Sequence, residues 1–193
     1  MRIIINLLLI AVIAGLVYVL IGGIREPIKF IDEKSRRERV VIDKLMTIRK
    51  TQELYRDITG HFAPTFDTLA YVLRNGRFKI IQVYGDPDDP TGGEITYDTI
   101  FKPAFDSIKA LGINLDSLKF VPFADGASFD IDADTLTYQS TVVDVVQVGT
   151  PRKVFMGPFA DPRFAKYDKA YDPNKPIKFG DMSKPNLSGN WEN

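Results

Sequence analysis

The feature that most constrains this chain is an apolar segment close to its N-terminus. Residues 3–24 read IIINLLLIAVIAGLVYVLIGGI, with Asn6 as the one strongly polar residue and no charged residue. As a helix this segment would be about 33 Å long, enough to cross a hydrocarbon core of about 30 Å. A cleaved signal peptide is the alternative, but the run is long for one and no small-x-small cleavage pattern follows it. The sequence therefore predicts a retained single-pass anchor over residues 1–24.

Composition argues against several classes of function. The chain has no cysteine, a single histidine (His61), and equal numbers of basic and acidic residues, 25 of each. Disulfides, cysteine-bound zinc and thiol catalysis are therefore excluded, and the balanced charge argues against a nucleic-acid partner. A lone histidine gives no support to a catalytic triad, and no phosphate loop, nucleophile elbow or dinucleotide fingerprint is present. We therefore expect neither enzymatic activity, nor a cofactor, nor a small-molecule substrate.

Residues 25–59 are predicted to continue the anchor as a juxtamembrane and amphipathic helix. Pro27 is expected to kink the helix or mark its exit from the membrane, and DEKSRRER at residues 32–39 is typical of a solvated stalk. The helix should end at Gly60, a residue suited to a helix C-terminus. Its apolar stripe is expected to pack on the chain's own sheet or on a neighbouring copy, and it consists of Val41, Leu45, Ile48 and Tyr55.

Residues 60–156 are predicted to form a small α+β domain. Phe62 is expected to turn into the core, and Thr65 to cap a short second helix. A third helix is expected at residues 103–111. Short strands are expected at residues 78–84, 94–101, 118–123, 127–131, 136–141, 142–148 and 153–156. Turns this closely spaced favour an antiparallel sheet.

The last part of the chain, residues 157–193, has a different composition. It is rich in proline, aspartate, lysine and asparagine. We expect an irregular C-terminal arm, with disorder as the alternative. Its aromatic residues would lie on another surface, and they are Phe159, Phe164, Tyr167, Tyr171 and Trp191.

Two aspartate clusters are the remaining candidates for chemistry. The first lies in the loop DPDDPTGG, where a calcium site would use Asp86, Asp88 and Asp89. That loop lacks a full calcium signature, and its prolines explain it equally well as a plain turn. The second cluster has the spacing i, i+2, i+4, which puts its members on one face of a strand: Asp130, Asp132 and Asp134. A solvated sheet face is the simpler interpretation, and a carboxylate-dependent hydrolase is the alternative.

The order of these parts resembles type IV pilins and the pseudopilins of type II secretion. The residues that carry this resemblance are Thr51, Gln52, Tyr55, Gly60, Phe62 and Leu69. The stretches IRKTQELYRDITGHFAPTFDTL and DSLKFVPFADGASFDI also resemble a family of single-span envelope proteins of Bacteroidota. The resemblance implies a pilin-like α+β fold, in which a transmembrane helix continues into an amphipathic helix packed on a small antiparallel sheet.

The resemblance also implies a function and a location. We expect a scaffold or assembly component of a secretion or pilus-like machine, held in the inner membrane with its folded domain in the periplasm. Its partners would be other envelope proteins or further copies of itself. The apolar run lacks the glutamate that pilins carry there, so a standard pilus is not expected. The seven basic residues between Arg25 and Lys44, against Arg2 before the span, favour the opposite orientation and a cytoplasm-facing adaptor.

Overall fold

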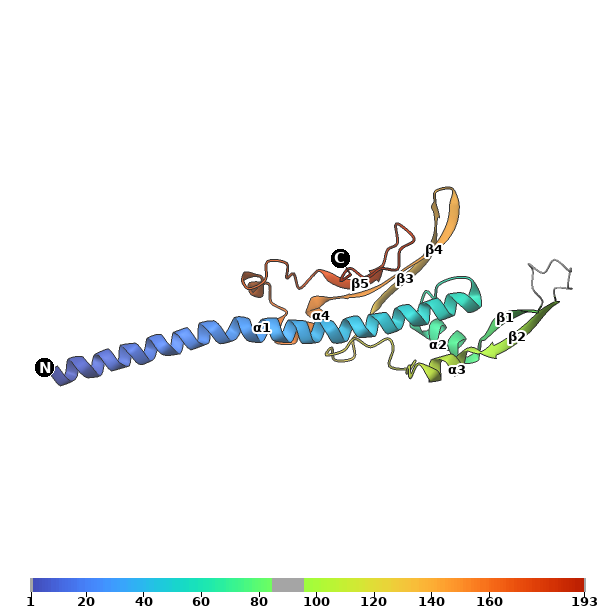
Figure 1. Cartoon of the computed structure of the whole chain (residues 1–193). Helices are drawn as coiled ribbons and strands as arrows, with labels where there is room; N and C mark the ends of the chain where they lie inside the picture. The colour runs from blue at the N-terminus through green and yellow to red at the C-terminus, as the bar shows by residue number, and fades with distance from the viewer. Residues whose placement is uncertain (1, 85–95, 193) are drawn as a thin grey trace, which may run out of the picture.

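The computed structural model describes residues 2–84 and 96–192 and is built around one long helix (Figure 1). Helix α1 runs from Arg2 to Thr59 over 58 residues and passes through Pro27 without ending. Pro27 therefore does not end the helix, and its suggested place at the exit from the membrane stays a prediction. The helix ends where expected, because Gly60 has φ +87°, a left-handed conformation that glycine adopts without strain.

The two halves of α1 have different surroundings. Every residue from Arg2 to Arg25 is exposed, and shielding by the rest of the chain begins at Glu26. The N-terminal half is long and apolar enough to cross a membrane, and none of its most apolar window is buried in the protein. The C-terminal half is the spine of the folded part, which we call the head: residues 26–84 and 96–192. The side chains that α1 buries there are Phe30, Val41, Leu45, Ile48, Thr51, Gln52 and Tyr55.

Two short helices pack beside α1 in the head. Helix α2 spans Phe66–Asn75, and its N-cap Thr65 accepts a hydrogen bond from the backbone N–H of Thr68 at 3.2 Å. Helix α3 spans Ala104–Ala110 and follows Pro103. Leu69 and Leu73 of α2 are fully buried, so this helix turns its apolar face to the core.

A two-stranded hairpin leaves the far end of the head. Strand β1 (Arg77–Tyr84) pairs antiparallel with β2 (Thr96–Pro103), with Arg77 opposite Pro103 and Tyr84 opposite Thr96. Figure 1 shows the pair extending away from the helices at the end opposite the N-terminus. Asp86, Asp88 and Asp89, the suggested calcium ligands, lie outside the described residues.

The second sheet is antiparallel and has the order β3-β4-β5. Strand β3 spans Asp130–Tyr138, β4 spans Thr141–Pro151, and β5 spans Pro176–Gly180. Two expectations fail near this sheet. Residues 118–123 and 127–131 share only one isolated bridge outside β3, because Pro122 and a left-handed Phe123 interrupt them. Residues 153–156 belong to a helix, α4 (Arg152–Met156), which starts after Pro151 and stops at left-handed Gly157.

The C-terminal part of the chain, expected to be an irregular arm, packs on the head and contains some regular structure. It contains two 3₁₀ helices, η1 (Gly157–Phe159) and η2 (Pro162–Lys166), before strand β5. Ile177 and Phe179 are two residues apart, so both lie on the inner face of β5, and both are buried in the same core as α1. The fold is therefore α+β, with one long helix packed on a small antiparallel sheet.

Candidate functional site

The most elaborate tertiary site lies where the head begins, beside residues 26–38 of α1. Phe30 is fully buried there by residues 157–171, which we call the collar segment. Its ring stacks on Phe164 with centroids 5.0 Å apart and meets Tyr171 edge-on at 4.9 Å. Phe159 and Tyr167 lie further out, at 6.0 and 6.3 Å. Aromatic pairs of this kind contribute about 0.5–1.5 kcal/mol each beyond their burial, so the collar is firmly attached to the helix.

A carboxylate at the outer edge of this cluster binds the collar segment from the helix side. Glu26 accepts a hydrogen bond from the Tyr167 hydroxyl. Its oxygens also lie 3.7 Å from Arg163 Nη2 and 3.6 Å from Lys166 Nζ. The hydrogen bond from Tyr167, with smaller contributions from both cations, lowers the pKa of Glu26. The carboxylate therefore stays ionised and holds three collar side chains.

Further ion pairs continue along α1 away from the apolar segment. Lys34 Nζ lies 2.6 Å from an oxygen of Asp168, and this hydrogen bond lowers the pKa of the aspartate. One helical turn later, Glu38 accepts a hydrogen bond from Arg152 at 2.7 Å. Both pairs are partly shielded from water, and the first holds the collar segment on α1 while the second holds α4 there.

Glu33 organises a second clamp on the same helix. It accepts hydrogen bonds from Arg36 and Arg37, each as short as 2.6 Å, and these lower the pKa of Glu33 to about 2. Arg37 in turn donates to the backbone carbonyl of Phe155 at 2.6 Å. The charged stretch at residues 32–39 is thus not only a solvated stalk, because several of its side chains bind the C-terminal half of the head.

The corner between α1 and α2 holds the residues on which the pilin resemblance rests. Gln52 is 1% exposed, and its amide makes two hydrogen bonds to one residue. Its Nε2 donates to the carbonyl of Ala63 at 3.0 Å, and its Oε1 accepts from the Ala63 N–H at 2.9 Å. The side chain therefore acts as a backbone partner for a chain reversal that begins at Gly60. Phe62 turns inward at this reversal and is buried.

His61 lies on the outer side of this corner and faces solvent. Its Nδ1 is 2.7 Å from an oxygen of Asp144, while 71% of its side chain is exposed. A hollow of about 180 Å³ beside it is also lined by Asp134 and Thr135. The pair links the corner to strand β4, and Thr135 is the hydroxyl side chain among the described residues that line the hollow.

The three aspartates of β3 do not converge on one place. Asp130 and Asp132 line a hollow of about 340 Å³ together with Asn174 and Lys178. Asp134 lines the separate hollow beside His61. Among the residues that the structure describes, no group of three or more histidine, cysteine or acidic side chains is placed to hold a metal ion.

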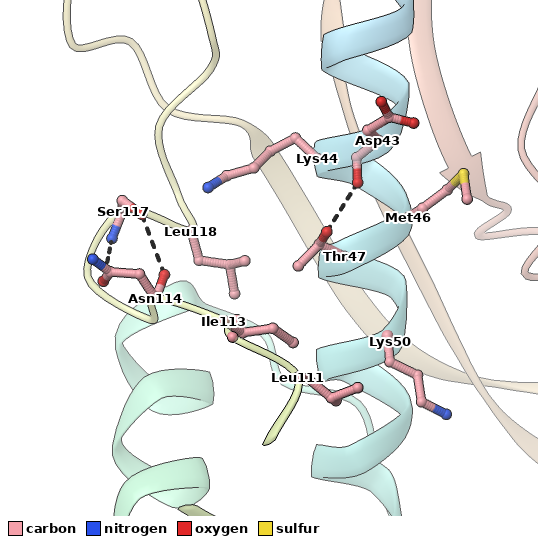
Figure 2. Close-up of a pocket in the computed structure, with 11 residues that line it drawn as sticks. Asp43, Lys44, Met46, Thr47, Lys50, Leu111, Ile113, Asn114, Ser117 and Leu118 are labelled. Atoms are coloured by element: carbon pink, nitrogen blue, oxygen red, sulfur yellow. Dashed lines mark hydrogen bonds between the residues drawn. The ribbon is translucent and has the colours of Figure 1, made fainter. Parts of the chain in front are cut away.

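A larger groove of about 560 Å³ lies between α1 and the loop after α3 (Figure 2). Leu111, Ile113 and Leu118 form its apolar side, and Lys44 reaches toward it from α1. Partial burial lowers the pKa of Lys44. The hydrogen bonds drawn in Figure 2 are local contacts, since Thr47 bonds the backbone of its own helix and Asn114 bonds Ser117. The groove therefore offers an apolar surface, and Asp43, Lys44 and Lys50 are the charged residues that line it among those the structure describes.

The predicted contact residues lie inside the molecule. Val41, Leu45 and Ile48 are fully buried, and Tyr55 and Phe62 are 7% and 6% exposed. They pack within the chain's own core and do not present a surface to a neighbouring copy.

Phe30 and its collar partners are the site residues that the sequence analysis did not assemble. The collar aromatics were expected to lie on another surface, and that surface is the chain's own α1. A usable signal was present, because Phe30 precedes Val41 by 11 residues, which is close to three helical turns and continues the same stripe.

No family model, curated protein or solved structure matches this chain.

Proposed function

We propose that this chain is a single-span membrane protein of a bacterial envelope and serves as a pilin-like scaffold or assembly component of a secretion or pilus-like machine. The observation that carries the proposal is the continuity of α1. One helix of 58 residues, about 87 Å at 1.5 Å per residue, is both the apolar segment and the spine of the head. Because no loop separates the two, the head would be held at a fixed height above the bilayer. Such a link suits an assembly component better than a freely moving tethered enzyme.

The start of the head supports the same assignment. Shielding of α1 begins at Glu26, two residues after the apolar run ends at Ile24. A soluble protein that exposed the whole of residues 3–24 would present a large apolar surface to water. A bilayer covers this surface and leaves every polar contact of the head outside the hydrocarbon core.

The hairpin β1–β2 offers the contact surface that an assembly component needs. Side chains on one of its faces are more than half exposed, and they are Ile81 (55%), Val83 (53%), Tyr97 (67%) and Phe101 (58%). Within the described residues neither strand pairs with a third strand. Two-stranded hairpins are marginally stable alone. A partner protein that covered this face would gain about 1.5–3 kcal/mol for each large apolar side chain that it buries.

Photo-crosslinking in cells tests this role. A photoreactive amino acid at Ile81 is expected to crosslink to a second envelope protein or to another copy of the chain. The same residue at Tyr71, which is 69% exposed on α2, is the matched control. Equal labelling from both positions, or labelling of lipid alone, would contradict an assembly role for the hairpin. A chain released from membranes by alkaline carbonate would contradict the anchor itself.

Orientation needs its own experiment, because the basic residues after the span favour the cytoplasm and the pilin resemblance favours the periplasm. The chain has no cysteine, so a single cysteine at exposed Ser128 reports one place in the head. In cells with a permeabilised outer membrane, an impermeant maleimide is expected to label this cysteine. Labelling only after the inner membrane is lysed would instead support a cytoplasm-facing adaptor.

The alternative of a membrane-tethered carboxylate-dependent hydrolase rests on Asp130 and Asp132, which share a hollow with Lys178. Its test is the triple alanine variant of Asp130, Asp132 and Asp134, assayed in the host for the loss of the phenotype that the intact gene supports. A variant that is folded and fully functional removes this alternative.

A further inference from the structure

The collar segment lies at the level where the apolar run ends. Figure 1 shows residues 160–170 as the part of the head nearest to the N-terminal half of α1. Along the helix axis, Glu26 lies about 3 Å beyond Ile24, and Phe30 lies about 9 Å beyond Ile24. The polar layer on each side of a bilayer is about 5–7 Å thick, from a total of about 40–45 Å around a core of about 30 Å. When Ile24 marks the edge of the hydrocarbon core, the side chains around Glu26 therefore lie among lipid headgroups.

Cationic side chains are concentrated at this level. The cationic patch consists of Arg25, Lys29, Arg163, Lys166 and Lys169, all of them exposed. On α1, Arg25 and Lys29 lie about 100° and 60° from Glu26 in the same direction around the helix, so both lie along one edge of the side that the collar segment covers. Arg163 and Lys166 thus lie within 3.7 Å of Glu26, and Arg25, Lys29 and Lys169 are further exposed cations of the same two segments.

The acidic residues of the collar segment are used within the protein. Asp168 binds Lys34, two helical turns further from the apolar run than Glu26. Asp161 accepts a hydrogen bond from the backbone N–H of Arg163 at the start of η2. Glu26 is shared between a hydroxyl and two cations at 3.6–3.7 Å, which leaves more than half of the Arg163 and Lys166 side chains exposed to another anion.

The aromatic residues of the collar suit the same environment. Tyr167 is partly buried against Phe30 and directs its hydroxyl to Glu26, and Phe159 is partly exposed beside it. Tyrosine and other amphipathic rings are enriched where a bilayer meets water, because one end of the ring is apolar and the other is hydrated. The collar thus combines an aromatic side and cations at one depth.

We propose that the cationic patch binds the headgroups of anionic phospholipids, so that lipid composition sets how the head is oriented on the membrane. This inference rests on the proposed membrane span. The phosphates of acidic lipids match the charge, and the patch comes to their level when α1 is inserted upright or tilted toward the collar segment. Ile28 and Ile31, on the opposite side of the helix and about half exposed, define the competing arrangement. A helix tilted toward them would lift the collar segment away from the headgroups.

The experiment uses the full chain in lipid nanodiscs made of phosphatidylcholine alone or mixed with phosphatidylglycerol. A single cysteine at exposed Ala170 carries a fluorophore, and a lipid with a nitroxide on its headgroup acts as the quencher. Separate cysteines at Leu9 and Ser128 report the middle of the apolar run and a distant part of the head. The test variant replaces Arg163, Lys166 and Lys169 with glutamine. The matched control makes the same change at three exposed lysines outside the collar segment: Lys50, Lys109 and Lys184.

Quenching at Ala170 is expected to be strong in discs that contain phosphatidylglycerol and weak in phosphatidylcholine alone, and to fall at high salt. Each cation near the surface strengthens binding to an anionic membrane about fivefold. The triple variant should therefore lower the ratio of membrane-bound to membrane-free collar segment roughly a hundredfold. The control variant should behave like the wild type, and Ser128 should stay unquenched.

Two other results overturn the inference. The first is that the label at Ala170 is not quenched at all. The second is that its quenching changes neither with lipid charge nor with the triple substitution. Either result shows that anionic lipid does not hold the collar segment. The label at Leu9 separates this failure from failure of the span. If a quencher deep in the acyl region reaches Leu9, the span stands and only the lipid contact is refuted. If it does not, the proposed anchor is refuted as well.

Discussion

Replacing Gln52 with leucine is expected to destabilise the head by several kcal/mol while leaving its apolar core filled. The two side chains have similar volumes, but leucine cannot replace the two hydrogen bonds that Gln52 makes to Ala63 at 2.9 and 3.0 Å. Ala63 is itself 0% exposed, so water cannot satisfy the N–H and C=O that are released. Each buried unsatisfied group costs about 1–3 kcal/mol, which gives about 2–6 kcal/mol for the pair.

The assay is urea unfolding of the full chain in nanodiscs, followed by the fluorescence of Trp191, the only tryptophan. The matched control is the same substitution at Gln82, which is exposed on β1 and should change the free energy of unfolding by less than about 0.5 kcal/mol. A Gln52 variant as stable as this control would refute the reasoning, because it would mean that Ala63 finds other partners.

Replacing Gln52 with glutamate adds a pH-dependent form of the same test. An ionised carboxylate can still accept from the Ala63 N–H but cannot donate to the Ala63 carbonyl, whereas the protonated acid can do both. Folding therefore favours the neutral form and raises the pKa of the introduced group. A raised pKa contributes stability at low pH that is lost as pH rises through it, so the gap to wild type should widen between about pH 4 and 8. A gap that does not change with pH would contradict this account.

Three further predictions concern the collar segment, the helix clamp and the α2 cap. Replacing the fully buried Phe30 with alanine should cost about 3–5 kcal/mol and expose the collar segment to limited proteolysis, whereas alanine at exposed Ile31 should do neither. Because the pKa of Glu33 is lowered to about 2, its stabilising contribution is present above its ordinary pKa of 4.5 and is lost as pH falls toward 2. A Glu33→Gln variant should therefore show a shallower loss of stability over that range in acid unfolding followed by circular dichroism. Replacing Thr65 with alanine removes the cap on the Thr68 N–H and should cost about 1 kcal/mol in urea unfolding, and an unchanged midpoint would contradict the cap.

Local patterns predicted the helical part of this protein well. The apolar run, the stripe from Val41 to Tyr55 and the stop at Gly60 are all encoded within a few residues of where they act. Thr65 likewise caps α2 from the position that the sequence indicated. Such features depend on helix periodicity and on capping, which need no information about distant parts of the chain.

Strand assignments were less reliable because a strand is completed by a partner that local sequence does not name. Residues 118–123 have strand-like composition yet form only one bridge. The stretch PIKFG at residues 176–180 lies in a proline-rich tail and nevertheless pairs with β4 along its whole length. Residues 153–156 are rich in apolar side chains and form a helix, because Pro151 and Gly157 delimit a single helical turn.

The candidate sites also differ in whether local sequence or the folded structure determines them. The sequence by itself determined that one segment can cross a membrane, that α1 carries an apolar stripe, and that cysteine chemistry is absent, because these depend only on residue type and spacing. Only the tertiary structure decided where the collar segment lies. It pairs Phe30 with Phe164, and Glu26 with Tyr167, across more than 130 residues of chain. Contacts of this range arise from packing and charge pairing in the folded state, and no local pattern records which partner each side chain will meet.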